Sequence, residues 1–264
     1  MTKPLRLFQV DAFTDQIFGG NPAAVCILEH WLEGATMQAI AAENNLSETA
    51  FAVKKSTDQY EIRWFTPTTE VALCGHATLA TAHILFQHYE TNTQQIHFVT
   101  QKAGGLSVKR EEAYLWLDFP TDTLQLTTLP DVLKEAFFTP PLEVYKGKDD
   151  YLLILANQAA VEAFQPDFSQ LVQVVARGII ITALGESVDF VSRFFAPQVG
   201  VNEDPVTGSA HTLLIPYWAK RLEENSLQAK QLSARGGDLQ CIYAEERVKI
   251  GGQAVTYLEG TIHI

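Results

Sequence analysis

The sequence has few cysteines, few basic residues and no long apolar run, and each shortage excludes a class of protein. Its three cysteines, Cys26, Cys74 and Cys241, are an odd number and lie far apart, so the pattern favours neither a disulfide framework nor a CxxC metal site. Lysine and arginine total 19 against 31 aspartates and glutamates, for a formal net charge of −12. We do not expect so acidic a chain to bind nucleic acid or an anionic membrane.

No apolar stretch approaches the roughly 18–20 residues that a membrane-spanning helix needs. The opening segment MTKPLRLFQVDAF has too little apolar length and no cleavage pattern for a signal peptide. We therefore expect a cytoplasmic protein with no membrane partner. At 264 residues, 47% hydrophobic and 19% charged, the chain has an ordinary composition for a folded protein and enough length for two domains.

The pattern along the chain predicts an α+β protein made of two halves. Helical spacing of apolar residues predicts helices over 37–45, 78–89 and about 210–224, and short apolar runs between them are typical of strands. A shift to Thr, Asp, Leu and Pro between 120 and 141 marks the expected boundary. We expect one domain over 1–119, to which a strand at about 255–264 could return, and a second over 120–254. In each, strands would meander around one long helix.

Two short motifs recur in the same order, which predicts an internal duplication. RWFTP at 63–67 recurs as RFFAP at 193–197, and GHATL at 75–79 recurs as GSAHTL at 208–213. The second copy therefore carries three extra residues between its proline and its glycine, and we assign them to Asn202–Asp204. In this alignment Cys74 corresponds to Thr207.

In both copies a glycine stands where a loop is expected to become a helix. The first turn of a helix has backbone N–H groups without intrahelical partners and carries partial positive charge, and glycine lets a ligand approach the backbone closely. Gly75, and Gly208 with Ser209, are therefore candidates for binding a carboxylate. If both sites face a cleft between the two domains, they could bind the same small molecule. A plain capping role is the alternative for each motif taken alone.

The segment EVALCGHATLATAH at 70–83 leaves another alternative open. Cys74 could be a nucleophile, because a helix N-terminus lowers the pKa of a thiol. His76, His83 and His88 are separated by seven and five residues, which does not place all three on one face of a helix. We therefore predict no metal site, and we assign the last two histidines to packing or to the surface.

At these residues the chain strongly resembles the phenazine-biosynthesis PhzF-like family, within the diaminopimelate epimerase-like fold. The matching pieces are VDAFTDQIFGGNPAAV, SETAF, RWFTPTTEVALCGHAT and GVNEDPVTGSAH. The resemblance implies two pseudo-symmetric halves, each a sheet rolled around a central helix, with the active site between them. It also implies a homodimer and catalysis without a metal or an organic cofactor. Residues 120–180 match poorly, so the substrate could differ from those of the family.

The resemblance also implies roles for individual residues. The glutamate of the SETAF motif, here Glu48, is the catalytic acid/base of the family. Glu48 stands among apolar residues, and a partly buried carboxyl group can take and return a proton near neutral pH; a solvated glutamate at a strand edge is the alternative. His76 and Asp204 are carried over as further catalytic residues, with structural roles as the alternative, and Asn21 is expected to be a turn residue.

We therefore predict a cofactor-independent isomerase of a small carboxylate, with Glu48 shuttling a proton while helix N-termini hold the carboxylate. Thiol-dependent epimerases of the same fold use one cysteine from each half, and the second place is Thr207 here. An amino-acid epimerase using Cys74 with a non-thiol partner stays an alternative, as does a non-catalytic small-molecule binder. The sequence identifies neither the substrate nor a part in a phenazine pathway.

Overall fold

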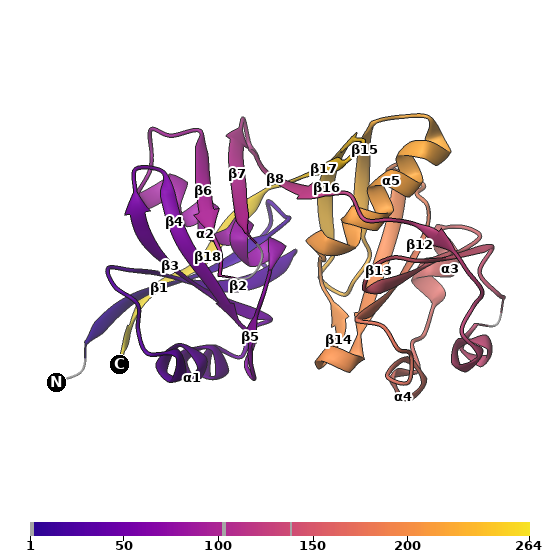
Figure 1. Ribbon diagram of the computed structural model, residues 1–264, viewed down its shortest axis with the longest axis horizontal. Coiled ribbons are helices and arrows are strands. Elements are labelled where there is room, and N and C mark those ends of the chain that lie inside the picture. The colour runs from indigo at the N-terminus through magenta and orange to yellow at the C-terminus, as the bar shows by residue number, and fades with distance from the viewer. Residues whose placement is uncertain (1–2, 102–103, 138) are drawn as a thin grey trace. The chain divides into compact units, whose positions relative to one another are not determined.

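The computed structural model describes residues 3–101, 104–137 and 139–264. The chain forms two compact units: unit 1 comprises Met1–Asp118 with Gly251–Ile264, and unit 2 comprises Phe119–Ile250 (Figure 1). Within the described ranges, no helix has both the length and the apolar character needed to cross a bilayer.

The strands of unit 1 pair in one continuous series. They are β1 (Pro4–Ala12), β2 (Asn21–Leu28), β3 (Glu48–Ser56), β4 (Gln59–Phe65), β5 (Glu70–Val71), β6 (Gln95–Val99), β7 (Gly105–Glu111), β8 (Tyr114–Pro120) and β18 (Ala254–His263). β1 pairs antiparallel with β18 and β2, β2 runs parallel to β3, and β4 pairs with β3, β5 and β6. β7 joins β6 to β8. The pairing of β18 with β1 brings the end of the chain back to the strand that begins it.

The central helix of unit 1 is α2 (Gly75–His88), which contacts β1, β2, β3, β7 and β18. Its start at Gly75 lies three residues before the helix that apolar spacing alone predicts. Every residue from His76 to Ala82 is buried, because a helix enclosed by strands must pack on all sides. A second helix, α1 (Gly34–Asn44), instead buries one side, formed by Met37, Ile40 and Ala41.

Unit 2 repeats this order of pairing. Its strands are β9 (Gln125–Leu126), β10 (Glu143–Lys146), β11 (Asp150–Ile154), β12 (Gly178–Leu184), β13 (Phe190–Ala196), β14 (Val201–Asp204), β15 (Ser226–Gln231), β16 (Gly237–Ala244) and β17 (Arg247–Gly252). β11 runs parallel to β12, β13 pairs with β12, β14 and β15, and β15 pairs with β16. β11 to β16 thus follow the scheme of β2 to β7. The fold is α+β with two pseudo-symmetric halves.

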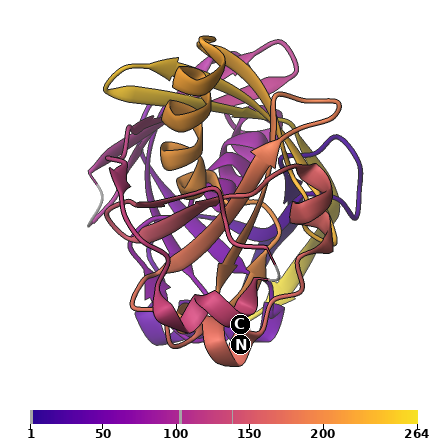
Figure 2. The ribbon, with the colours of Figure 1, turned by 90° about the vertical axis from the view of Figure 1, so that its right-hand side faces the viewer.

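The long helix of unit 2 is α5 (His211–Leu222), drawn in orange in Figure 2. It contacts β15 and β16, and the Trp218 ring stacks on that of Phe190 with centroids 5.8 Å apart. The helix expected over about 210–224 is therefore present. A short 3₁₀ turn, η3 (Gly208–Ala210), precedes it, so the opening at Gly208 is a tighter turn than the α-helix that was expected.

Sequence periodicity missed the short helices of unit 2. They are η1 (Asp131–Ala136), α3 (Gln158–Ala163), α4 (Phe168–Leu171) and the turn η2 (Pro197–Val199). η1, α3 and α4 supply Leu133, Val161 and Leu171 to an apolar cluster that also includes residues of β11, β12 and β13. Helices of four to six residues are too short to show a 3.6-residue repeat.

Strand register makes the duplication explicit. Phe51 stands opposite Arg63 in unit 1, and Ile181 stands opposite Arg193 in unit 2. The offset in residue number is the same from 51 to 181 as from 63 to 193. β3 and β4 therefore correspond to β12 and β13 without a gap.

The next strand shows where the second copy is longer. Trp64 stands opposite Val71, whereas Phe194 stands opposite Asp204. The offset in residue number from 71 to 204 is three larger than the offset from 64 to 194. The three extra residues of the second copy therefore precede Asp204. They belong to the turn that contains η2 and Gly200, whose φ is 86°.

An ion pair that occurs in both units confirms this placement. Arg63 binds Glu70 with N–O distances of 2.7 and 2.8 Å, and Arg193 binds Glu203 with distances of 2.7 and 3.0 Å. Glu203 is the counterpart of Glu70 and cannot be an extra residue. The assignment of the extra residues to Asn202–Asp204 is therefore wrong.

Candidate active site

In unit 1 the side chains of Glu48, Cys74 and His76 converge at the start of α2. Glu48 is the first residue of β3, Cys74 immediately precedes α2, and His76 is the second residue of the helix. Oε2 of Glu48 lies 3.2 Å from Nε2 of His76, and Sγ of Cys74 lies 3.5 Å from Nδ1 of the same ring. The structure thus brings together three residues that the sequence singles out separately.

The three side chains differ in how far they reach solvent. The side chain of His76 is 5% exposed and that of Glu48 is 16% exposed, while Cys74 is buried. Glu48 is therefore not the solvated strand-edge residue that was the alternative. A carboxylate that is mostly enclosed but still reachable suits proton exchange with a small molecule.

Two neighbours favour the charged form of the His76 ring. Burial opposes charge on His76, but the adjacent Cys74 and Glu48, through charge and hydrogen bonding, raise its pKa well above the ordinary value. Burial, followed by the charge of Glu48, raises the pKa of Cys74 to about 11, so the thiol is neutral at pH 7. A neutral thiol carries no charge, so near pH 7 the support for a charged His76 ring comes from Glu48.

The same environment acts on the thiol of Cys74. A helix N-terminus lowers the pKa of an exposed thiol, yet here burial and the negative charge of Glu48 outweigh that effect and raise the pKa of Cys74. Burial and the charge of Glu48 thus oppose formation of the thiolate that a nucleophilic Cys74 would need.

Asn21 is a member of the cluster that sequence reasoning missed. It was expected to be a turn residue, but it begins β2, is fully buried, and places Nδ2 3.2 Å from Nδ1 of His76. As the amide is placed, Nδ2–H of Asn21 donates to Nδ1 of His76 when that nitrogen is unprotonated, and a doubly protonated ring would require the amide oxygen to face it instead. The available signal was a polar residue directly before the apolar run PAAVCIL.

The cluster also has the composition of a metal site. One ligand atom each from Glu48, Cys74 and His76 lie within 4.8 Å of one another, and all three types bind Zn²⁺. Binding would require a thiolate and a neutral imidazole, which the raised pKa values of Cys74 and His76 oppose. The other two histidines of α2 have different surroundings: His83 contacts Thr256 at 3.1 Å, and the His88 ring lies 5.1 Å from that of Phe8.

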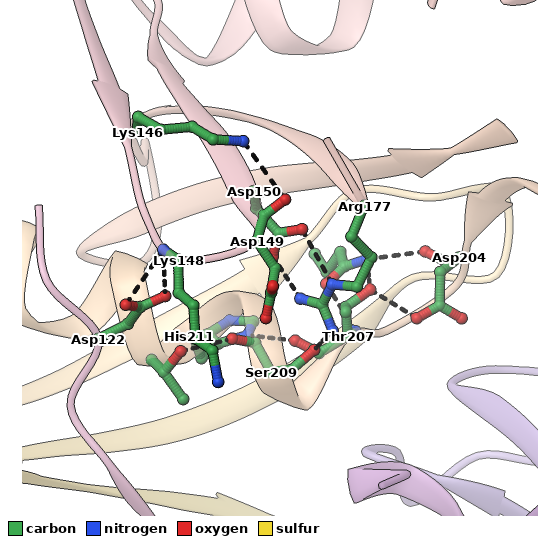
Figure 3. A network of polar contacts seen from close by, with 12 residues as sticks. Asp122, Lys146, Lys148, Asp149, Asp150, Arg177, Asp204, Thr207, Ser209 and His211 are labelled. Atoms are coloured by element: carbon green, nitrogen blue, oxygen red, sulfur yellow. Dashed lines mark hydrogen bonds and ion pairs between the residues drawn. The ribbon is translucent and has the colours of Figure 1, made fainter. Parts of the chain in front are cut away.

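In unit 2 the segment before η3 is fixed by side-chain hydrogen bonds (Figure 3). Oγ1 of Thr207 donates to Oδ2 of Asp204 at 2.6 Å. Gln231 accepts from the backbone N–H of Thr207 at 2.9 Å and donates to the carbonyl oxygen of Asp204 at 2.7 Å. Thr207, at the place matching Cys74, therefore orients Asp204.

An arginine that sequence reasoning missed holds Ser209. Nη1 of Arg177 donates to Oγ of Ser209 at 2.9 Å, and Nε donates to Oδ1 of Asp150 at 2.9 Å. Nη2 of Arg177 also binds Oδ2 of Asp150, which makes the ion pair bidentate (Figure 3). Burial opposes the charge of Arg177, but Asp150 raises its pKa, so the guanidinium stays charged. No motif in the sequence marks this arginine.

His211, the first residue of α5, is a neutral structural histidine. Its Nδ1 lies 2.9 Å from the carbonyl oxygen of Thr207, and burial lowers its pKa to about 4. The ring therefore donates Nδ1–H to that carbonyl and adds no charge near Ser209.

Comparisons with solved structures agree with the fold. A PhzF-family protein of Enterococcus faecalis is 47% identical, and the match covers 99% of this chain and 100% of that chain with a TM-score of 0.95. A probable proline racemase of Agrobacterium radiobacter, 8% identical, matches with a TM-score of 0.64 over 98% of this chain and 92% of that chain. The second likeness shows a shared fold alone.

Sequence comparison adds a family and a class. The family model described as "Phenazine biosynthesis-like protein" matches residues 10–260. "Uncharacterized isomerase PA2770" of Pseudomonas aeruginosa is 51% identical over 98% of this chain and 99% of its own length. The protein is an isomerase with a diaminopimelate epimerase-like fold. It belongs to the phenazine biosynthesis-like, or PhzF-like, family, as the sequence motifs predict.

Proposed function

We propose that the protein is a cofactor-independent isomerase of a small carboxylate, in which Glu48 shuttles a proton between two carbons on one face of the substrate. The proposal depends chiefly on one observation, the 3.2 Å contact between Oε2 of Glu48 and Nε2 of His76. It supports the proposal because an enclosed ion pair holds a base in a fixed place.

Glu48 is the group that moves the proton. As a carboxylate it accepts a proton from one substrate carbon, and as a carboxylic acid it returns that proton to another, so the side chain ends as it began. His76 donates a hydrogen bond to the carboxylate and balances its charge. A positioned acid/base of this kind contributes about 10²–10⁴-fold to a rate.

The substrate carboxylate is assigned to the two glycine motifs. The backbone N–H groups of Gly75, Gly208 and Ser209 are the proposed donors, because N–H groups in the first turn of a helix lack intrahelical partners. The same donors would stabilise negative charge that develops when the proton leaves carbon. Asp204 is retained as a proposed second catalytic residue, oriented by Thr207.

Solvent exchange tests the proposal. Small carboxylic acids are incubated with the protein in deuterated water, and deuterium at carbon is measured by mass spectrometry. For an acid that exchanges, Glu48→Gln should lower the rate by about 10²–10⁴-fold with an unchanged circular dichroism spectrum. Glu259→Gln is the matched control, because Glu259 is an exposed glutamate of the same unit and its loss should leave the rate unchanged.

Other outcomes would select the alternatives. Retained exchange in Glu48→Gln would reject Glu48 as the base. Loss of exchange in Cys74→Ser, with Glu48→Gln active, would favour the thiol-dependent epimerase. Binding of carboxylates without exchange of any would favour the non-catalytic binder.

The same proposal includes the setting of the enzyme. We expect a cytoplasmic homodimer without nucleic-acid or membrane partners, as the family resemblance and the acidic composition indicate. Sedimentation equilibrium should give twice the mass of one chain, and a monomer at micromolar concentration would reject the dimer.

A further inference from the structure

Strand register gives Glu48 a counterpart in unit 2. Glu48 stands opposite Ala23 on the parallel strand β2, and Gly178 stands opposite Asp150 on the parallel strand β11. Phe51 of β3 corresponds to Ile181 of β12, and the same offset in residue number relates position 48 to position 178. The place of the proposed base in unit 1 is therefore occupied by a glycine in unit 2.

Gly178 has no space for a side chain. A Cβ atom there would lie 2.3 Å from Cζ of Phe194 and 3.2 Å from Oδ1 of Asp150. Phe194 is itself buried, so its ring cannot move away freely. Unit 2 cannot carry a second carboxylate at this place, and the residue beside it, Arg177, provides a charged group of the opposite sign.

We propose that Arg177 is a positioning residue that acts through Ser209 to fix the substrate carboxylate. This inference rests on the proposed function, because it names the side chains that hold the carboxylate of that substrate. Asp150, whose side chain is 3% exposed, binds two guanidinium nitrogens and sets the direction of the third, Nη1, which binds Oγ of Ser209.

The direction of these hydrogen bonds gives Ser209 its role. A guanidinium can only donate, so Oγ of Ser209 accepts from Nη1 and its own proton is left for another acceptor. A hydroxyl polarised by a charged donor binds an anion more strongly than it binds a neutral carbonyl. The side chain of Arg177 is 37% exposed, so a small anion can reach this part of unit 2.

Binding of benzoate, with benzamide as the uncharged probe of the same shape, tests the inference. In ¹H–¹⁵N spectra of the full chain, benzoate should shift the amide signal of Ser209 and the Nε–H signal of Arg177, and benzamide should not. Arg177→Met should weaken benzoate binding about tenfold, and Arg177→Lys should recover part of the loss. Arg6→Met removes an arginine from an exposed ion pair and should change nothing.

A double-mutant cycle separates positioning from general structural support. If Arg177 acts through Ser209, then Ser209→Ala weakens binding by a similar factor, and Arg177→Met adds less than about twofold to it. Arg177→Met leaves the buried Asp150 unpaired and could unfold unit 2. In that case the single variant Asp150→Asn is compared with the double variant that carries both Asp150→Asn and Arg177→Met. The difference in benzoate binding between these two proteins then replaces the measurement on Arg177→Met alone.

Three results would overturn the inference: benzoate binding within twofold of wild type in Arg177→Met, additive effects of the two substitutions, or no shift at Ser209 in the wild type. Failure of the proposed function looks different. Benzoate binding at Ser209 with no carbon exchange of any acid would reject the isomerase and leave Arg177 in place. Carbon exchange that depends on Glu48 but not on Arg177 would support the isomerase and reject the role of Arg177.

Discussion

Nε2 of His76 and Oε2 of Glu48 lie 3.2 Å apart, although β4 and β5 come between the two residues in the chain. They meet because β3 and α2 contact each other and each carries its functional residue at its N-terminal end. A rigid strand and a rigid helix therefore set the geometry of the pair, and neither residue depends on a long loop.

Replacing His76 with glutamine should lower carbon exchange by about tenfold at pH 7 and change its pH profile. His76 must be protonated to balance Glu48, and its pKa is raised well above 6.5. Wild-type activity should therefore be lost as pH rises through that raised pKa, and the variant should lack this basic limb. Rates measured between pH 6 and 10 would show it, and an identical basic limb in both proteins would refute the role.

Cys74→Ser should keep exchange within about threefold of wild type, because a thiol with a pKa of about 11 takes little part in proton transfer near pH 7. Activity should also survive dialysis against a chelator. Added Zn²⁺ should inhibit the wild type more than Cys74→Ser, and more strongly at higher pH, because binding must displace the thiol proton. Equal inhibition of both proteins would exclude Cys74 as a ligand.

Gly178→Ala should lower the free energy of unfolding by about 1–3 kcal/mol, because the added methyl group would lie 2.3 Å from Cζ of Phe194. Gly34→Ala is the matched control, because a Cβ atom at Gly34 meets no atom within 4 Å. Urea denaturation measures both variants. Unchanged stability in Gly178→Ala would show that Phe194 can move, and that the lack of space at Gly178 does not explain the asymmetry of the units.

Acid should destabilise the protein between pH 6.5 and 4 through its buried neutral histidines. Burial lowers the pKa of His211 from 6.5 to about 4, so in this interval the unfolded chain binds more protons than the folded one, and stability falls as pH falls. The loss for one such group is up to about 3 kcal/mol at pH 4. His211→Gln should flatten the plot of unfolding free energy against pH, and an unchanged slope would contradict the assignment.

Much of the fold could be predicted because its long elements carry strong local patterns. The expected helices over 78–89 and 210–224 correspond to α2 and α5, and two recurring motifs indicated the duplication before any coordinates. The details between the motifs could not be predicted. The turn around Gly200 and the short helices α3 and α4 depend on caps and tertiary packing, and a motif alignment placed the extra residues beyond the turn that contains them.

The site divides in the same way. Glu48, Cys74 and His76 belong to motifs, so the sequence identifies them, but it does not show how burial acts on the thiol. Asn21 was misread because turn chemistry in GGNP hides a residue whose side chain is buried. Arg177 could not be found, because it lies 32 residues from Ser209 in a segment without a motif, and only the pairing of β11 with β12 brings Asp150 beside it.

The pairing of β1 with β18 has a consequence for how the enzyme is made. The N–H of Lys3 donates to the carbonyl oxygen of Ile264 at 2.7 Å, so unit 1 takes strands from both ends of the chain, while unit 2 is one unbroken segment. A ribosome synthesises the whole of unit 2 before it adds residues 251–264. The half that carries Glu48 is thus begun before unit 2 and completed after it, and its sheet lacks β18 beside β1 until residues 251–264 have been made.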